Sequence, residues 1–332
     1  MAGLTLAEFF DTWWRLHAEP NLEPATLRLY RGMWERHARL RLGPVALEEL
    51  SPLALVQFRT DLEADGVGPE AIRKTLSMLQ GVLQRAVEWQ LVEVNAAKVV
   101  RKPPSGRLRA VQPIGPEAVE TMRRELLDRG RERNAILLGL LAYAGLRPQE
   151  ALALEWRHVR ERTLVVEQAL SDGRVKGLKN RRRPRAVDLL DPLRRDLAAW
   201  RATCGDAIAG DSPVVPNNAG GYWRDTDWRN WRRRVFKPAA AAAGLEATRP
   251  YDLRHAFVSL LIHEGRWSVV EIAGQLGHTP TVCLDIYAHE LAERRGEPGV
   301  GAEERIWAAR ARAESECRPH SFRDRRLVPR AP

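Results

Sequence analysis

Cysteine, lysine and long apolar runs are scarce in this chain of 332 residues. The three cysteines (Cys204, Cys283 and Cys317) are odd in number and widely spaced, which excludes a disulfide framework and a zinc-binding pattern and indicates a cytoplasmic protein. No apolar run approaches the roughly 18 residues that a membrane helix needs, so we expect no membrane partner. The first residues place no basic flank before an apolar core, and we therefore expect no secretory signal.

Positive charge is abundant and unevenly distributed. The formal net charge is +10, and 47 of the 53 basic residues are arginine, whose planar guanidinium group suits phosphate. A GC-rich genome would raise the arginine content in the same way. The net charge is −2 over residues 1–100, +9 over 101–292 and +3 over 293–332. We therefore expect a polyanion to contact mainly the second half of the chain.

Helix signals predict a mainly α-helical protein with a small antiparallel β-sheet. Within residues 1–100, a capping box at Thr5 and Glu8 and prolines at positions 24, 52 and 69 each precede apolar residues at helical spacing. These four helices are expected to form a bundle with its own core, in which the aromatic side chains pack.

The rest of the chain divides into three predicted segments. Residues 101–113, which mix proline, glycine and charge, are predicted to be a linker. Residues 114–292 are predicted to form a second domain of helices with three short strands at 163–167, 174–178 and 185–189. Residues 293–332 have little apolar periodicity and are predicted to form a mobile basic tail.

Two segments of the second domain carry cations suited to an oxyanion. Arg147 follows an apolar helix and precedes Pro148, which starts another helix, so it lies beside backbone N–H groups. The simpler alternative is that it only pairs with Glu150. The second segment, 174–185, is read as a hairpin that is either a solvated basic loop or a finger that reaches nucleic acid and delivers one lysine to a reaction centre. Its seven cations, without an acid, are Arg174, Lys176, Lys179, Arg181, Arg182, Arg183 and Arg185.

Two further segments contain candidate reactive groups. Tyr251 and Arg254 are three residues apart and share a helical face. His278 is predicted to lie in a turn after a helix that ends at Gly277, and Tyr287 follows nine residues later in the next helix.

Together, these four segments resemble the tyrosine recombinase, or phage integrase, family. The matching phrases run in the family's order over roughly residues 113–290. They are Gly145-Leu146-Arg147 with Glu150, Lys179, Tyr251 to His255, Leu276-Gly277-His278 and Tyr287. The resemblance implies an N-terminal SAM-like core-binding domain and a C-terminal α+β catalytic domain.

The resemblance also implies a mechanism, with Tyr287 as the nucleophile that forms a 3′-phosphotyrosine intermediate without ATP. Arg147 and Arg254 would hold the nonbridging oxygens of the phosphate, and His278 would donate to them. Lys179 would protonate the leaving oxygen; Lys176 lies on the same arm but does not match the family's spacing to Arg185. No metal and no cofactor are expected.

Two positions depart from the family's pattern. Tyr251 stands where the family often has histidine, and its phenol, with a pKa of about 10, is a poor general base. Whether Tyr251 is catalytic or only structural is left open. His158, after Trp156, replaces the family's usual aspartate and is expected to be a structural difference. His255 and His289 are expected to be supporting or core residues.

The expected partner is double-stranded DNA, with the protein in the cytoplasm, associated with the nucleoid. The hairpin cations are the predicted DNA contacts, and the segment 223–237, with six basic residues and three tryptophans, either binds phosphates or packs in the core. By resemblance, four protomers would act on DNA, with accessory directionality factors as further partners. The role is that of an integrase of a mobile element or a Xer-like resolvase; a type IB topoisomerase and an inactive DNA-binding relative are the alternatives.

Overall fold

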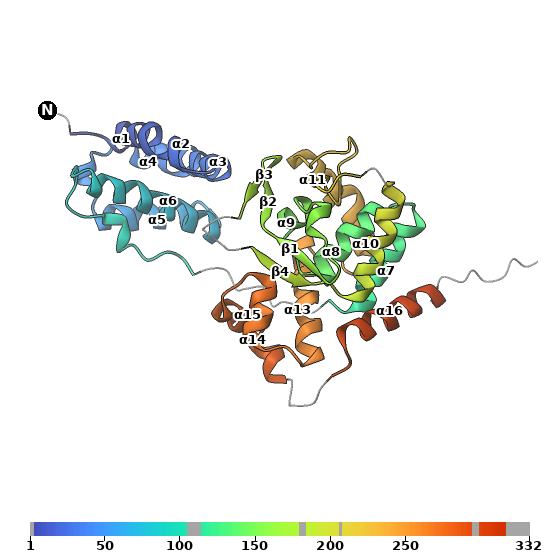
Figure 1. Ribbon diagram of the computed structural model, residues 1–332. Coiled ribbons are helices and arrows are strands. Elements are labelled where there is room, and N and C mark those ends of the chain that lie inside the picture. Colours follow the sequence, from blue (N-terminus) through green and yellow to red (C-terminus); the bar gives the residue numbers. More distant parts are fainter. Residues whose placement is uncertain (1–2, 105–113, 179–183, 206–207, 294–298, 317–332) are drawn as a thin grey trace, which may run out of the picture. The chain divides into compact units, whose positions relative to one another are not determined.

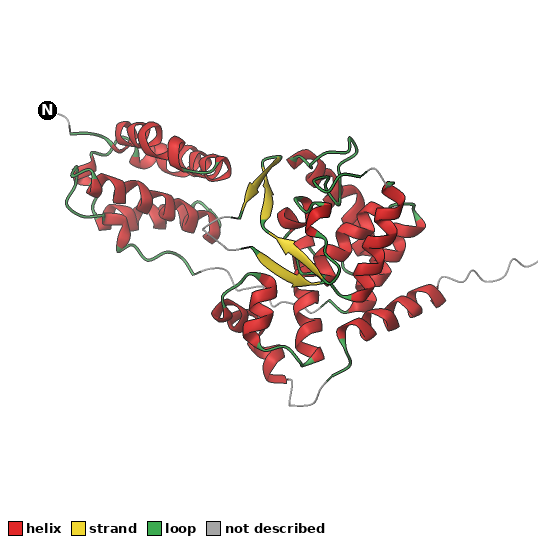
Figure 2. Ribbon diagram, viewed as in Figure 1, coloured by secondary structure: helices red, strands yellow, loops and turns green. Residues whose placement is uncertain are grey.

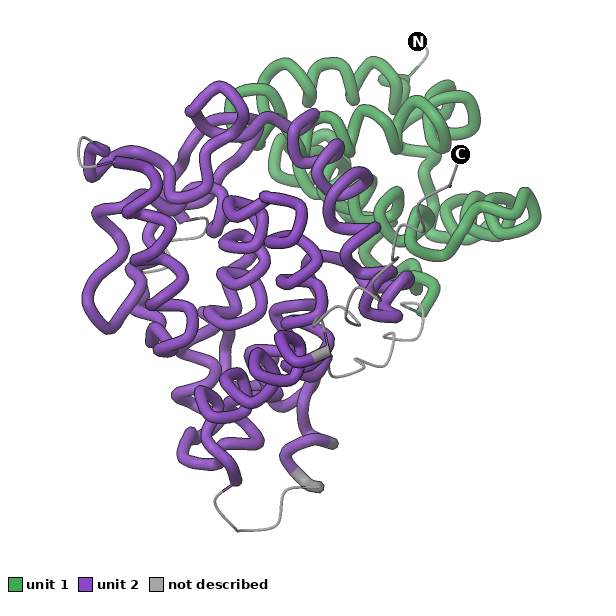
Figure 3. The backbone as a smooth tube through the Cα atoms, turned by 90° about the vertical axis from the view of Figure 1, so that its right-hand side faces the viewer, with its two compact units in different colours: residues 1–110 green, residues 111–332 purple. Residues whose placement is uncertain are grey.

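The computed structural model describes residues 3–104, 114–178, 184–205, 208–293 and 299–316. The chain forms two compact units, Met1–Ala110 and Val111–Pro332 (Figure 3). The boundary between them falls within the predicted linker 101–113. Helices dominate both units, and the described strands form a small antiparallel sheet in the second (Figure 2), which confirms the predicted fold class. No helix of the described ranges is both long enough and apolar enough to cross a membrane.

The helices of the first unit begin at the predicted signals. Thr5 caps α1 because its side chain accepts from the backbone N–H of Glu8, while the Glu8 carboxylate accepts from the Thr5 backbone N–H at 3.0 Å. Single π-helical turns, Trp14–Ala18 and Trp34–Ala38, join α1 to α2 and α3 to α4. The helices are α1 (Leu6–Trp13), α2 (Glu19–Asn21), α3 (Pro24–Met33), α4 (Arg39–Leu42), α5 (Pro52–Ala64) and α6 (Pro69–Glu88).

Aromatic side chains hold this first unit together. The rings of Phe10 and Trp34 stack with centroids 4.1 Å apart, and Trp13 is buried beside them. The guanidinium carbon of Arg31 lies 4.1 Å from the centroid of the Trp14 ring, a cation–π contact. The unit therefore has its own core, and the prediction that its aromatic residues pack is confirmed.

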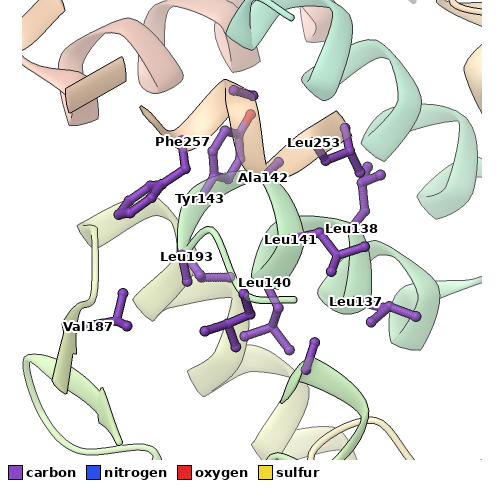
Figure 4. Close-up of a cluster of buried hydrophobic side chains, with 14 of the residues drawn as sticks. Leu137, Leu138, Leu140, Leu141, Ala142, Tyr143, Val187, Leu193, Leu253 and Phe257 are labelled. Carbon is purple, nitrogen blue, oxygen red and sulfur yellow. The ribbon is translucent and has the colours of Figure 1, made fainter. Parts of the chain in front are cut away.

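The second unit is built around α8 (Glu132–Tyr143), which is buried almost throughout. Its side chains point in several directions toward residues of the surrounding elements, including Val187, Leu193 and Phe257 (Figure 4). It packs against α7, α10 and α13. The helices of the unit (Figure 1) are α7 (Pro116–Asp128), α8, α9 (Pro148–Leu152), α10 (Asp191–Cys204), α11 (Asp225–Trp231), α12 (Lys237–Ala242), α13 (Leu253–Glu264), α14 (Val269–Leu276), α15 (Pro280–Glu293) and α16 (Ala302–Glu316).

The four strands form two antiparallel ladders along one long hairpin. The strands are β1 (Thr163–Val166), β2 (Gln168–Ser171), β3 (Arg174–Gly177) and β4 (Arg185–Asp188). Asp172 and Gly173, at φ +52° and +72°, make the two-residue turn between β2 and β3, and β4 pairs with β1. The prediction that 174–185 is itself a hairpin is therefore wrong, because β3 and β4 pair with other strands. Residues 178–184 are instead an insertion between them, and 179–183 lie outside the described residues.

The prediction of a mobile tail is wrong for α16, which packs against α7, α10 and α13. Ala302, Ile306 and Ala309 share a helical face and are buried. Arg310 is 7% exposed and forms ion pairs with Asp196 at 2.6 Å and Glu120 at 3.2 Å. The many charges of this segment had masked its short apolar stripe. The rest of the predicted tail, 294–298 and 317–332, lies outside the described residues.

The Arg310 ion pairs predict how α16 contributes to stability. Arg310→Ala would leave the carboxylates of Glu120 and Asp196 buried with less compensation, and we expect unfolding free energy to fall by about 3 kcal/mol. Chemical denaturation of the full chain measures this. The matched control is Arg312→Ala on the same helix, since Arg312 is exposed and its 3.5 Å pair with Glu117 should contribute less than about 1 kcal/mol. Equal losses in both variants would contradict the assignment.

Candidate active site

Arg147 lies at the junction of α8 and α9, where a glycine fixes the path of the chain. Gly145 has φ +57°, and a Cβ atom there would lie 2.5 Å from Cδ1 of Phe257, so only glycine fits. Arg147 precedes Pro148, the first residue of α9. Its backbone N–H donates to one oxygen of Glu150 at 2.9 Å, and its guanidinium donates to the other at 2.8 Å. Arg147 therefore pairs with Glu150, as the spacing of three residues allows.

Glu150 gathers more than one arginine. Its carboxylate is 4% exposed and accepts from Arg185 at 2.7 and 3.1 Å, while a guanidinium nitrogen of Arg254 lies 3.9 Å away. Burial alone would raise the pKa of Glu150, but the hydrogen bonds and positive charges of Arg185 and Arg147 outweigh it and lower the pKa to about 2. Glu150 is therefore a fixed anion that holds the cationic groups in position.

Arg254 is the most deeply buried cation of the site, at 1% exposure. Its guanidinium donates to the carbonyl oxygens of Gly145 and Leu276, and Nη2 lies 3.2 Å from Nε2 of His278. Arg147 makes longer contacts of 3.5 Å with the carbonyl oxygens of Leu276 and Gly277. The C-terminal end of α14, where carbonyls lack helical partners, thus faces both arginines. Burial and the charge of Arg147 lower the pKa of Arg254.

A helix C-cap positions His278. Gly277 ends α14 in the left-handed conformation, at φ +63°, and the backbone N–H of His278 donates to the Ala273 carbonyl at 2.9 Å. A Cβ atom at position 277 would lie 3.2 Å from Cδ of Arg185. Nε of Arg185 donates in turn to the carbonyl oxygen of Gln275 at 3.0 Å. The predicted turn is confirmed, and it brings the imidazole of His278 against Arg254.

Tyr287 lies in α15 and is 1% exposed. Its hydroxyl is hydrogen-bonded to Nδ1 of His255, the residue that follows Arg254 in α13. Burial raises the pKa of Tyr287, and the nearby charge of Arg254 opposes this rise. Burial also lowers the pKa of His255. The phenol and the imidazole are therefore in contact, and the positive charge of Arg254 lies near enough to act on both.

Such a set of groups can transfer a phosphoryl group to the phenol. Preorganised guanidinium donors stabilise the charge that develops on phosphoryl oxygens, and a tyrosine hydroxyl can form the covalent bond. Among the residues that the structure describes, no three His, Cys, Asp or Glu side chains are grouped to hold a metal ion.

A basic groove of about 730 Å³ opens beside these groups. Its rim includes Pro148 and Gln149, directly after Arg147, and Tyr251, which is 39% exposed. No carboxylate is among the described residues that line it. Its cations are the exposed side chains of Arg229, Arg232, Arg233, Lys237 and Arg249.

The tryptophans beside this groove contribute mainly to the core. Trp223 and Trp231 are 3% and 4% exposed, and the rings of Trp228 and Trp231 stack with centroids 4.9 Å apart. The prediction that the segment 223–237 packs in the core is therefore confirmed for Trp223 and Trp231. Trp228 and four of the six cations, Arg229, Arg232, Arg233 and Lys237, line the groove instead.

A family model described as "Phage integrase family" matches residues 116–294, more than half of the chain. The chain belongs to this family. It is 27% identical to "Tyrosine recombinase XerC" of Methylobacterium sp. (strain 4-46), over 81% of this chain and 82% of that protein. It is 26% identical to the XerC recombinase of Agrobacterium fabrum, over 79% of each chain. The resemblance to the tyrosine recombinases is therefore confirmed.

Solved structures of integrases have the same fold. An integrase of the Tn1549 transposon, in complex with transposon right end DNA, superposes with a TM-score of 0.70 at 17% identity and covers 94% of this chain and 98% of that one. A lambda integrase dimer bound to a COC′ core site gives a TM-score of 0.61 at 16% identity, over 84% and 97%. Both likenesses confirm the predicted architecture of a helical N-terminal domain and a catalytic domain.

The structure brings several predicted site residues of this tyrosine recombinase together. Arg147, Arg254 and His278 meet at the end of α14. The Tyr287 hydroxyl is hydrogen-bonded to His255, which follows Arg254 in the chain, and Tyr251 lies at the groove rim. Their catalytic roles stay predictions.

The predicted hairpin cations lie in three different settings. Arg174 and Lys176 lie in β3, and Arg174 is exposed. Arg185 was predicted to contact DNA, but its guanidinium is 11% exposed and bonded to Glu150, so it belongs to the interior of the site. The remaining candidates, Lys179, Arg181, Arg182 and Arg183, lie outside the described residues.

His255 is the site residue that sequence reasoning missed. It was expected to be a supporting or core residue, yet it contacts the Tyr287 hydroxyl. The available signal was its helical position, because it follows Tyr251 by four residues and therefore shares that residue's face. His158 is 4% exposed and is hydrogen-bonded to the Glu155 backbone N–H and the Glu167 carboxylate, which agrees with the structural role expected for it.

The low pKa of Glu150 predicts an acid-dependent loss of stability. The folded-state pKa, about 2, lies below the ordinary value of 4.5, so this group stabilises the fold fully above 4.5 and loses its contribution as pH falls toward 2. Glu150→Gln should lower unfolding free energy by about 3 kcal/mol at neutral pH and flatten its decline between those pH values. Chemical denaturation across pH measures both effects. Glu117→Gln, at an exposed pair, should keep the wild-type profile, and an equally steep decline in Glu150→Gln would contradict the prediction.

Proposed function

We propose that this protein is a site-specific DNA recombinase that cuts and rejoins DNA strands through Tyr287. The chain is a member of the tyrosine recombinases, and enzymes of this kind act as DNA strand transferases. One observation carries the proposal: Arg147, Arg254 and His278 meet around the end of α14, and the buried Tyr287 hydroxyl is hydrogen-bonded to His255, the residue that follows Arg254.

In the proposed reaction, Oη of Tyr287 attacks the phosphorus of the scissile phosphate, and the bond to the 5′ oxygen breaks. The product is a 3′-phosphotyrosine, which keeps the energy of the phosphodiester bond, so rejoining to a 5′ hydroxyl needs no ATP. Arg147 would exchange its carbonyl contacts for phosphate oxygens. These contacts, at 3.5 Å, are long for hydrogen bonds, so an anion would displace them readily.

Lys179 is the proposed general acid for the leaving 5′ oxygen. It belongs to the insertion 178–184, and the residue that follows this insertion, Arg185, is bonded to Glu150 inside the site. Because Arg185, six residues after Lys179 in the sequence, is fixed inside the site, we propose that the Lys179 ammonium protonates the leaving oxygen of the phosphate that Arg147 would hold.

Double-stranded DNA is the proposed substrate, and the basic groove is its proposed binding surface. The cations of the groove lie on α11, on the π-helical turn Arg232–Phe236, on α12 and just before the turn that precedes α13, next to the residues that would hold the scissile phosphate. Phosphate contacts of this kind position the duplex without reading its sequence. Arg174 and Lys176 on β3 are proposed to add to them.

Two roles share this chemistry, integration of a mobile element and resolution of chromosome dimers. Relatives at 27% and 26% identity are named XerC, which supports the second role, and an integrase with the same fold supports the first. In either role we propose a tetramer on DNA with accessory directionality factors. An attachment-like repeat or a dimer-resolution site beside this gene would distinguish them.

The proposed nucleophile is tested by a covalent adduct. A nicked duplex, selected from random-sequence DNA by binding to the full chain, should yield a protein–DNA adduct with the wild type and none with Tyr287→Phe, because the variant lacks the attacking oxygen. Denaturing electrophoresis of labelled DNA measures the adduct. Tyr222→Phe is the matched control, since Tyr222 is bonded to Glu155 away from the cluster. An adduct with Tyr287→Phe would exclude Tyr287 as the nucleophile.

The groove is tested by the salt dependence of binding. Replacing Arg232 and Arg233 together by alanine should weaken DNA binding similarly for all sequences and reduce the slope of log K against log salt by about 2. Fluorescence anisotropy with the selected duplex measures this. Arg195→Ala with Arg312→Ala removes two exposed arginines of the same unit outside the groove. A slope unchanged in the groove variant, or reduced equally in the control, would refute the groove as the binding surface.

A further inference from the structure

The reacting phenol has a histidine partner that its predicted role leaves unexplained. Among the described residues, the hydrogen-bond partner of Tyr287 Oη is Nδ1 of His255. The two ring centroids are 5.6 Å apart, with the planes inclined at 57°. Because Tyr287 is 1% exposed, bulk water has little access to its hydroxyl, and a proton leaving it needs an acceptor from the protein.

Tyr251 is poorly suited to accept that proton. A phenol is a weak base, because phenols in general keep their proton at neutral pH. The Tyr251 ring is 39% exposed at the groove rim and lies edge-on to the His255 ring, with centroids 6.0 Å apart. His255 lies one helical turn further along the chain, and Nδ1 of its imidazole is hydrogen-bonded to the Tyr287 hydroxyl.

We propose that His255 is a catalytic residue that accepts the proton of Tyr287 during strand cleavage. The proposal rests on the function proposed above. As the bond between Oη and phosphorus forms, the O–H bond of Tyr287 breaks and its proton moves to Nδ1 of His255. The bond from phosphorus to the 5′ oxygen breaks with its electron pair on that oxygen, which takes a proton from Lys179. Rejoining reverses both proton transfers.

The surroundings of His255 keep its imidazole neutral, as an acceptor requires. Burial is the largest cause that lowers its pKa; Arg254 and Arg249 act in the same direction, and Asp252 opposes them. A neutral ring that carries its hydrogen on Nε2 presents a lone pair at Nδ1. Among the described residues, the charged groups that act on His255 are Arg249, Asp252 and Arg254 on its own segment. The rings of Tyr251 and Tyr287 lie against it, and Cys283 and Glu290 on α15 act on Tyr287.

The variant His255→Asn separates proton transfer from packing. The Asn side-chain oxygen can occupy the position of Nδ1 and accept the hydrogen bond, but it cannot take the proton. With the selected nicked duplex, we expect single-turnover adduct formation at neutral pH to fall by about a hundredfold or more. The remaining rate should rise about tenfold per pH unit, because it needs phenol that is already ionised. His263→Asn, at an exposed histidine of the same helix, should keep the wild-type rate and pH profile.

A second variant covers the case in which His255→Asn does not fold. His255→Ala leaves space for an external base, and added imidazole should restore adduct formation in proportion to its unprotonated form. A wild-type rate and pH profile in His255→Asn, or His255→Ala without rescue although it binds the duplex, would overturn the proposal. Absence of the adduct in the wild type would instead contradict the proposed function.

A measurement without DNA tests the inference independently. In the full chain labelled with ¹⁵N-histidine, the NMR signal that disappears in His255→Asn should show an unprotonated Nδ1 that accepts a hydrogen bond at neutral pH. A protonated Nδ1 there would overturn the proposal, because such a nitrogen cannot accept the proton of Tyr287.

Discussion

The cationic site depends on one buried carboxylate. Glu150 accepts hydrogen bonds from Arg147 and Arg185 and lies 3.9 Å from Arg254, so a single anion holds guanidinium groups from three segments of the chain. Like charges would otherwise drive these groups apart, and burial would make each more costly. Because the pKa of Glu150 is lowered to about 2, its charge persists at any pH at which the protein works. Because one anion faces several cations, the site keeps a net positive charge, and such a charge favours the binding of a phosphate.

The carbonyl oxygens at the end of α14 are acceptors for both arginines of the site. The Leu276 carbonyl accepts from both Arg254 and Arg147, and Gly277 accepts from Arg147. Carbonyls at a helix C-terminus carry partial negative charge, so they satisfy the buried guanidinium groups without neutralising them. Arg254, the more deeply buried arginine, is held by short contacts with carbonyl oxygens. The carbonyl contacts of Arg147 are longer, at 3.5 Å. In the proposed reaction, a phosphate would therefore replace the carbonyl contacts of Arg147 and leave those of Arg254 in place.

Much of this site was predictable because the signals are local. Gly277 before His278 predicts a turn, and Glu150 three residues after Arg147 predicts a pair; both depend on helix geometry alone. The contact of Arg185 with Glu150 joins residues 35 positions apart, and that of His255 with Tyr287 joins residues 32 apart. Such contacts depend on how helices and strands pack, which periodicity does not encode. The helix α16 was missed because charged residues surround its three buried apolar side chains.

Arginine and lysine can have different functions in this enzyme, and lysine is scarce. Arginine remains protonated in proteins, so it can hold a phosphate through an entire reaction but cannot give it a proton. Lysine can do so when its surroundings lower its pKa, and only six of the 53 basic residues are lysine. Within 174–185 the choice is between Lys176, which lies in β3 opposite Ala169, and Lys179, in the insertion between β3 and β4. The spacing to Arg185 that is typical of the family is matched by Lys179 and not by Lys176. Proton donation therefore favours Lys179, with the arginines left to hold the charge.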